Sequence, residues 1–222
     1  LVAAVLMLLG RFTMTWQIPV VSAIFLLATV ILLIADLEHP ERFYMVLTRP
    51  QWRSWLVRGG IILTAFAAIL GLQLIWPSRI VAMIGIPLAI ASGTYTAWLF
   101  AQAKARDLWQ SPLLPLQHLV ACVMAGAATL ALFGVPAGLP LIAGLHLAII
   151  AAEVLTPHVT AHARLAIHEM VRGEYRVAFA VGFLLQLFGI VTPAPIGAIL
   201  ILLGLLAYEH AHVGAGQAVP LA

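Results

Sequence analysis

Asp36, His39 and Arg42 stand close together at the end of a long apolar run. Residues 18–35 hold no charged side chain, and Asp36 follows them directly. One helical turn would place Asp36 and His39 on the same side of a helix. A carboxylate beside an imidazole at a membrane edge can relay protons. The alternative is an interfacial helix cap, in which Arg42 pairs with Asp36 and Pro40 ends the helix. The residue types alone favour the cap.

Tyr95 lies in a second group of residues with chemical potential, together with Ser92, Gly93 and Thr94. Hydroxyl groups beside a glycine inside an apolar helix suit the head group of a quinone. The glycine leaves room for the ring, and the phenol can donate a hydrogen bond to a quinone carbonyl. The alternative is close packing of small residues, with Ser92 and Thr94 bonding to carbonyls of their own helix. Both interpretations stay open at this point.

Glu153 and His146 are seven residues apart in an apolar segment, so a helix places them on one face. Ionisable side chains within such segments usually face a bundle interior or water. One interpretation is a proton path through the membrane. The other, which the residues slightly favour, is a buried structural pair joined by hydrogen bonds.

The histidines do not predict a haem or a metal site. His118 and His146 differ in depth by about 7–8 Å at 1.5 Å per residue, so they do not match as axial ligands of one haem. We expect His158, His162 and His168 to be surface residues of a solvated loop. The single cysteine, Cys122, cannot hold an iron–sulfur cluster or a Cys-rich zinc ion. Any such centre is expected in a partner protein, and no metal site is predicted here.

The elements that position these residues are membrane-spanning helices. The chain is 64% hydrophobic and 9% charged, too few charges to cover a water-soluble domain of 222 residues. The apolar runs are each about long enough to cross a ~30 Å hydrocarbon core and show no alternation. The fold class is therefore all-α integral membrane, with about eight transmembrane helices. We expect these at 1–10 (truncated at its start), 17–36, 57–76, 80–103, 113–134, 138–156, 177–192 and 195–208, the last able to extend into Glu209–His212.

Basic residues are distributed unequally between the two ends of these helices. Nine of the eleven Lys and Arg fall in the connections near residues 42–58, 104–106 and 164–176, and only Arg11 and Arg79 lie on the other side. The positive-inside rule then places the arginine-rich loops in the cytoplasm, in a bacterial or archaeal cytoplasmic (inner) membrane. An equally weighted alternative is that these arginines also dock a soluble partner, because forked donors suit polar interfaces.

Two motifs together resemble a known family. Residues 36–43, DLEHPERF, are similar to the "D-L-x-x-P-x-R-F" turn of the NrfD/PsrC family of membrane subunits of polysulfide-reductase-like complexes. Residues 93–97 followed by 106–115, RDLWQSPLLP, resemble the family's tyrosine helix and its "R-x-x-W-N-S-P-L-L-P" loop. Residues 172–176 resemble a later loop. The resemblance spans most of residues 30–190 and is specific at the first two motifs.

The resemblance implies eight helices in two four-helix bundles without haem. It implies a first bundle over 1–103 holding a quinone site, a second over 113–208, and a tail over 209–222, all in one membrane domain. It further implies electron exchange with a four-cluster iron–sulfur subunit, which contacts a molybdopterin-type catalytic subunit. The family's quinone tyrosine corresponds to Tyr95, and the acid of its turn corresponds to Asp36. The family's other quinone contacts come from the start of its first helix, which has no counterpart here.

Our hypothesis is therefore a quinone-reactive anchor of a respiratory molybdenum or tungsten enzyme, using menaquinone or ubiquinone. Alternatives are a proton-translocating subunit as in alternative complex III, a structural anchor without redox function, and a transporter. The expected residues fall into three groups. They are Ser92, Gly93, Thr94 and Tyr95 for the quinone; Asp36, His39, His146 and Glu153 for proton transfer; and Arg42, Arg49, Arg53, Arg106 and Trp109 for partner docking.

Overall fold

The computed structural model describes residues 1–220, with only the backbone described at Leu47. It is helical, and residues 1–220 contain no β-strand. The chain divides into two compact units, Leu1–Leu99 and Phe100–Ala222. The helices are α1 (Val2–Leu8), α2 (Gln17–Ala35), α3 (Met45–Thr48), α4 (Trp55–Ile75), α5 (Arg79–Phe100), α6 (Leu114–Leu132), α7 (Leu139–Leu155), α8 (Ala161–Val171), α9 (Arg176–Val191) and α10 (Ile196–Ala218), with 3-10 turns η1 (Pro40–Arg42) and η2 (Asp107–Gln110).

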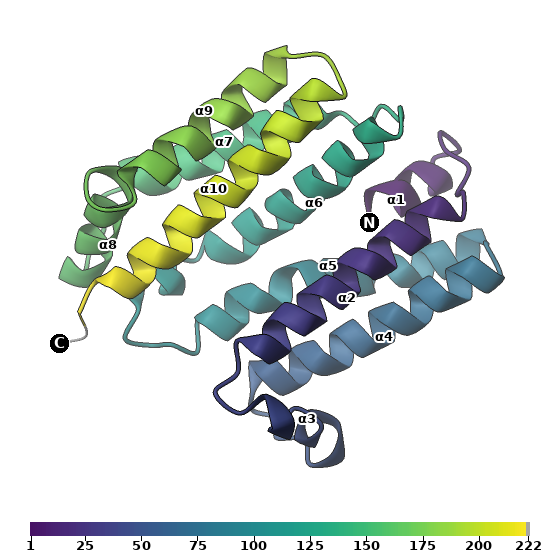
Figure 1. Ribbon diagram of the computed structural model, residues 1–222, viewed down its shortest axis with the longest axis horizontal. Coiled ribbons are helices and arrows are strands. Elements are labelled where there is room, and N and C mark those ends of the chain that lie inside the picture. The colour runs from purple at the N-terminus through teal and green to yellow at the C-terminus, as the bar shows by residue number, and fades with distance from the viewer. Residues whose placement is uncertain (221–222) are drawn as a thin grey trace. The chain divides into compact units, whose positions relative to one another are not determined.

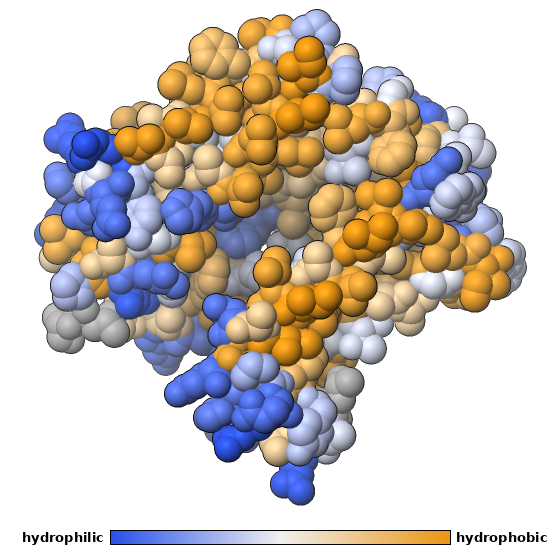
Figure 2. Space-filling view, viewed as in Figure 1, coloured by the Kyte–Doolittle hydropathy of each residue, from blue (hydrophilic) through white to orange (hydrophobic). Residues whose placement is uncertain are grey.

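Five of these helices are long and apolar enough to cross a membrane: α2, α4, α5, α6 and α10. A sixth candidate arises if α8 and α9, bent by 69° at their junction, form one broken span, and α7 is a shorter apolar helix. Figure 2 shows hydrophobic side chains along the helices and hydrophilic ones gathered beyond the end of α2 and around α8. A helix is present at each of the eight predicted positions, while eight membrane crossings stay a prediction.

Two predicted features of the second unit were wrong. The solvated loop expected at His158–His168 contains α8, whose apolar face buries Ala163, Ala166 and Met170. Its start is capped by Thr160, whose hydroxyl accepts a hydrogen bond from the N–H of Ala163 at 3.2 Å. The last helix also runs beyond both its predicted end at residue 208 and the predicted extension to His212, since α10 continues to Ala218. Tyr208 and His212 of this helix lie on a face that other helices cover.

The first unit is organised around α4, against which α2 and α3 pack. The start of α4 joins the end of α5 through the rings of Trp55 and Trp98, stacked with centroids 5.3 Å apart. The side chain of Ile69 packs closely against Gly85 of α5, where an added Cβ would lie 3.0 Å from Ile69 Cγ2. The arrangement brings the end of α2, the start of α4 and the end of α5 into one region.

The second unit is a ring of four helices, in which α6 packs on α7, α7 on α9, α9 on α10, and α10 on α6 (Figure 1). The helices α9 and α10 approach at their backbones. An added Cβ on Gly182 would lie 2.6 Å from the backbone nitrogen of Tyr208, and one on Gly204 would lie 2.8 Å from the carbonyl oxygen of Gly182. Such small-residue contacts are common between membrane helices. They hold the face of α10 that carries Tyr208 and His212 toward the interior.

Candidate functional site

Tyr95 lies in the last part of α5, in the interior of the first unit. Its side chain is 2% exposed, and its ring rests against the backbone of α4 at Gly59. A Cβ on Gly59 would overlap ring atoms Cδ2 and Cε2. Among the residues that the structure describes, none makes a hydrogen bond to the Tyr95 hydroxyl. A fixed ring with an unpartnered phenol is able to donate to a ligand oxygen.

The neighbouring hydroxyl groups are used within α5 itself. The Ser92 hydroxyl donates to the carbonyl of Ala89 at 3.0 Å, and the Thr94 hydroxyl donates to that of Ile90 at 2.9 Å. This is the back-bonding considered as the alternative for these two residues. Tyr95 therefore differs from Ser92 and Thr94 in having a hydroxyl that its own helix does not engage.

The turn after α2 is exposed and is held by pairs other than those expected. α2 ends at Ala35, so His39 lies outside the helix, and the predicted shared face with Asp36 was wrong. Glu41 takes the place predicted for Asp36, because His39 Nδ1 lies 3.2 Å and Arg42 Nε lies 4.0 Å from its Oε1. The predicted Asp36–Arg42 pair is absent from residues 1–220. The Asp36 carboxylate is exposed directly beyond the last turn of α2.

Two adjacent glycines of α4 connect this turn with Tyr95. Gly59 receives the ring of Tyr95, and Gly60 receives the side chain of Val46 from α3, which follows the turn in sequence. An added Cβ on Gly60 would lie 2.8 Å from Val46 Cγ1. The turn segment and the tyrosine helix thus pack against the same turn of α4.

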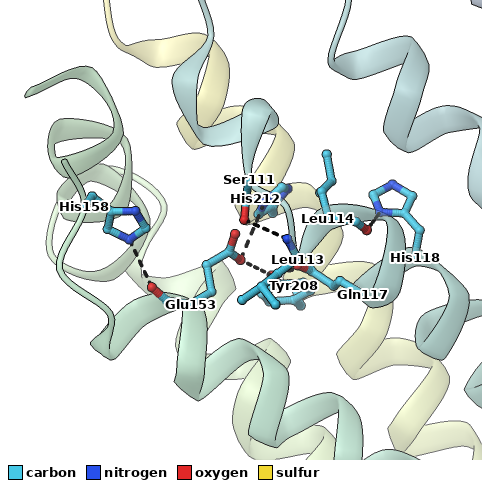
Figure 3. Close-up of polar contacts among 9 residues, drawn as sticks. All are labelled: Ser111, Leu113, Leu114, Gln117, His118, Glu153, His158, Tyr208 and His212. Atoms are coloured by element: carbon cyan, nitrogen blue, oxygen red, sulfur yellow. Dashed lines mark hydrogen bonds and ion pairs between the residues drawn. The ribbon is translucent and has the colours of Figure 1, made fainter. Parts of the chain in front are cut away.

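A polar network fills the interior of the second unit at Tyr208, which is 0% exposed (Figure 3). Gln117 of α6 donates to the Tyr208 hydroxyl at 2.5 Å. That hydroxyl in turn donates to Oε2 of Glu153 on α7, at 3.5 Å. His212, one turn beyond Tyr208 on α10, has its Nε2 3.8 Å from the same carboxylate oxygen. The network joins three helices around one buried carboxyl group.

His146 does not bond to Glu153, although both were placed on one face of the same helix. Its Nδ1 donates instead to the side-chain oxygen of Gln186 on α9 at 2.7 Å. Its ring meets the ring of Tyr208 edge to face, with centroids 5.5 Å apart. His146 and Glu153 are therefore both neighbours of Tyr208, the first at its ring and the second at its hydroxyl.

Arg106 and Trp109, which were predicted to dock a partner, make contacts inside the second unit. Arg106 Nη1 donates to the carbonyls of Gly216, Gln217 and Val219 at 2.8–3.1 Å. These carbonyls end α10, where backbone acceptors lack helical partners. The Trp109 ring is 7% exposed, stacks on Phe100 and fills the space beside Gly216. Both residues fasten η2 to the end of α10.

Arg42, Arg49 and Arg53 are exposed around the turn and the start of α4. Within the described residues, Arg49 and Arg53 have no ion pair. Arg58 differs from them, because its Nε donates to the carbonyl of Trp52 at 2.7 Å and its guanidinium lies 4.8 Å from the ring centre of Trp55. Arg42, Arg49 and Arg53 therefore remain on the surface. In the part of the chain that the structure describes, the Arg42–Glu41 contact at 4.0 Å is their one ion pair.

Several residues of these sites were missed from the sequence. Gly59 and Gly60 carry a recognisable signal, since a glycine pair is unfavourable inside a helix unless something packs closely there. Tyr208 and His212 were assigned to the helix end and the tail, although their i, i+4 spacing continues the helix of α10. Gln117 and Gln186 had a weaker signal, a lone amide in an apolar helix. Within residues 1–220, no group of three or more His, Cys, Asp or Glu side chains could hold a metal ion.

Comparison with known proteins assigns the chain to a family. Neither the curated proteins nor the solved structures compared with the chain contain a match. The family model described as polysulphide reductase, NrfD, matches residues 12–202. That match includes the turn after α2, the tyrosine of α5, η2 and most of the second unit. The chain therefore belongs to the polysulphide reductase NrfD family, whose members are membrane subunits of oxidoreductase complexes.

Proposed function

We propose that this chain is the quinone-reactive anchor of a respiratory molybdenum or tungsten enzyme. It exchanges electrons between the membrane quinone pool and a four-cluster iron–sulfur subunit, which contacts a molybdopterin-type catalytic subunit. The observation that carries this proposal is the geometry of Tyr95. Its ring is fixed against Gly59, and its hydroxyl has no partner among the described residues. The NrfD family, to which the chain belongs, is quinone-reactive in general.

The residues fit a quinone head group as follows. A quinone carbonyl needs a hydrogen-bond donor in an apolar setting, and the Tyr95 phenol is such a donor. Quinol oxidation releases two protons with two electrons, so a proton acceptor must lie within reach. Asp36 and His39 stand exposed in the turn before α3, and α3 packs through Val46 on the same turn of α4 as Tyr95. We assign the head group to Tyr95, with Gly93 beside it, and proton exchange with water to Asp36 and His39.

The exposed arginines support docking of the iron–sulfur subunit at this end of the first unit. Arg42, Arg49 and Arg53 are available to the carboxylates of a partner. Arg106 and Trp109 serve the fold of the second unit, as their internal contacts indicate. The membrane is the bacterial or archaeal cytoplasmic membrane, the arginine-rich loops face the cytoplasm, and the quinone is menaquinone or ubiquinone.

The decisive experiment measures quinone-linked turnover of the intact complex in Tyr95→Phe and Asp36→Asn variants. Tyr95→Phe keeps the ring against Gly59 and removes only the hydroxyl. Loss of one hydrogen bond of about 1–1.5 kcal/mol corresponds to roughly a tenfold decrease. Tyr44→Phe is the matched control, because Tyr44 is 60% exposed just after the turn.

Turnover with an artificial electron donor to the partner subunits should stay unchanged in all of these variants. Wild-type quinone-linked rates in both Tyr95→Phe and Asp36→Asn would reject the site. Normal assembly without binding of a quinone analogue would favour the structural anchor instead.

A second function, proton translocation as in alternative complex III, is favoured by the buried network of the second unit. Glu153 and His146 were its predicted members, and both neighbour Tyr208. Proton release that depends on Glu153 during quinone turnover would support it. A transporter has less support. It would require membrane-spanning helices that are interrupted at corresponding positions in both units.

A further inference from the structure

Unpaired polar atoms in the second unit gather around Glu153 and Tyr208. The buried atoms without a hydrogen-bond partner there include Oε1 of Glu153, both ring nitrogens of His212, Oε1 of Gln117 and Nε2 of His146. Buried polar groups are nearly always satisfied, if not by protein then by ordered water. So many unpaired atoms around one hydroxyl indicate that water completes the network.

Water has a route to this network. A cavity of about 340 Å³ lies between η2, the end of α7 and the start of α8, and Glu153 lines it. Its other polar lining includes Asp107, Ser111 and Thr160. Glu153 itself is only 1% exposed, so its carboxyl group stands at the boundary between the cavity and the closed interior. One oxygen accepts a hydrogen bond from Tyr208, and the other makes none within the described residues, although the Ser111 side chain, which also lines the cavity, acts on this carboxyl group.

The charge of the cluster limits its protonation states. Within the described residues, no lysine or arginine forms an ion pair with Glu153. An isolated carboxylate is costly in such surroundings, whereas a neutral carboxyl group or a carboxylate beside an imidazolium is tolerated. His212 is 0% exposed and is the one imidazole that an ion-pair contact joins to this carboxylate in residues 1–220.

We propose that Glu153 and His212 share one exchangeable proton, which enters from water in the cavity, and that Tyr208 is the positioning residue for the carboxylate. When the proton moves from Oε2 of Glu153 to Nε2 of His212, one O–H bond breaks and one N–H bond forms. The net charge of the pair stays zero. At 3.8 Å the transfer needs a bridging water or a small approach of the two side chains. This proposal adds a specific site to the proton-transfer part of the proposed function. Only the physiological role of the site rests on the proposed function.

Other titratable groups surround Glu153 and His212. A titration must distinguish their signals from those of this pair. Asp107 lies in the cavity lining, and His158 donates from its Nε2 to the backbone carbonyl of Glu153 at 3.0 Å. His146 meets the ring of Tyr208, and Glu209 adjoins Tyr208 in α10. The remaining titratable or charged groups of the elements packed around the pair are His118 and Cys122 of α6, His162, Arg164, His168 and Glu169 of α8, Arg176 of α9, and His210 of α10.

The test is infrared spectroscopy of the full chain, purified in detergent and titrated with pH in H₂O and D₂O. The wild type should show a titrating carboxyl C=O band that shifts on deuteration, and Glu153→Gln should lose it. Tyr208→Phe should keep the band at a shifted frequency, because it removes the hydrogen bond and little volume. His212→Gln should abolish an imidazolium band and move the titration of the carboxyl band. Glu174→Gln, at an exposed glutamate before α9, is the matched control and should match the wild type.

The same carboxyl bands in wild type and Glu153→Gln would overturn the proposal. A carboxyl band with the same pH titration in wild type and His212→Gln would also overturn it, because the pair would then share no proton. Circular dichroism verifies that each variant is folded, and Tyr208→Phe gives a result even where Glu153→Gln does not fold. The measurement uses no quinone. Its failure therefore leaves the quinone site intact, and loss of quinone turnover in Tyr95→Phe leaves this site intact.

Discussion

The ring of Tyr95 lies so close to the Cα of Gly59 that no larger residue fits at position 59 without moving the tyrosine. The contact joins α5 to α4 and fixes the direction of the phenol. It also explains why a residue without a side chain stands near the start of a long membrane helix, where it otherwise costs about 0.5–1 kcal/mol relative to alanine. The glycine therefore acts on the proposed quinone site through the position of Tyr95.

Gly59→Ala should reduce quinone-linked turnover at least tenfold while the complex still assembles. The added methyl group displaces the Tyr95 ring and with it the hydroxyl. The control is Gly71→Ala in the same helix, where an added Cβ meets nothing within 4 Å. Turnover of purified complexes from both variants checks the prediction, and equal rates would contradict it.

Gly60→Ala should loosen α3, and Val46→Ala should compensate for it. The new methyl group would meet Cγ1 of Val46, which Val46→Ala removes. We expect the double variant to be more stable than Gly60→Ala alone, a coupling of about 0.5–2 kcal/mol. Thermal unfolding in detergent measures it. Additive effects of the two substitutions would show that the two side chains do not meet.

Arg106→Gln should destabilise the second unit by about 1–3 kcal/mol, the usual range for lost hydrogen bonds to a charged donor. The substitution leaves three carbonyls at the end of α10 without their donor and removes a cation from the negative end of the helix. Lys104→Gln, an exposed basic residue two positions away, should leave the melting temperature nearly unchanged. A docking role for Arg106 predicts the reverse, with normal stability and weaker binding of the partner.

Gln186→Leu should cost about 0.5–2 kcal/mol, because it leaves Nδ1 of His146 without its partner in a buried setting. Nε2 of His146 already has none among the described residues. His146→Leu in the same background should recover part of the loss, since it removes the unpaired imidazole. Equilibrium unfolding of the single and double variants checks this, and a double variant no better than Gln186→Leu would count against it.

Hydrophobicity alone predicted where most helices lie. Long apolar runs bounded by charged turns are unambiguous when the solvent is a bilayer, so the starts of α2, α4, α5 and α6 were predicted closely. The same criterion missed α8, which is short and exposes Arg164 and His168. The signal that could have found α8 was there, in Thr160 as a cap and in buried Ala163, Ala166 and Met170 at helical spacing.

The sequence by itself determined the membrane class, the positions of the apolar helices, the two family motifs and Tyr95 as the residue to examine. These depend on local composition and on order along the chain. Only the tertiary structure decided which polar groups meet: Tyr95 with Gly59, Glu153 with Tyr208 and His212, Arg106 with the end of α10. Each of these contacts joins residues of different elements. Helical periodicity fixes the face on which a side chain lies, but the neighbour that covers that face is set by how the helices pack.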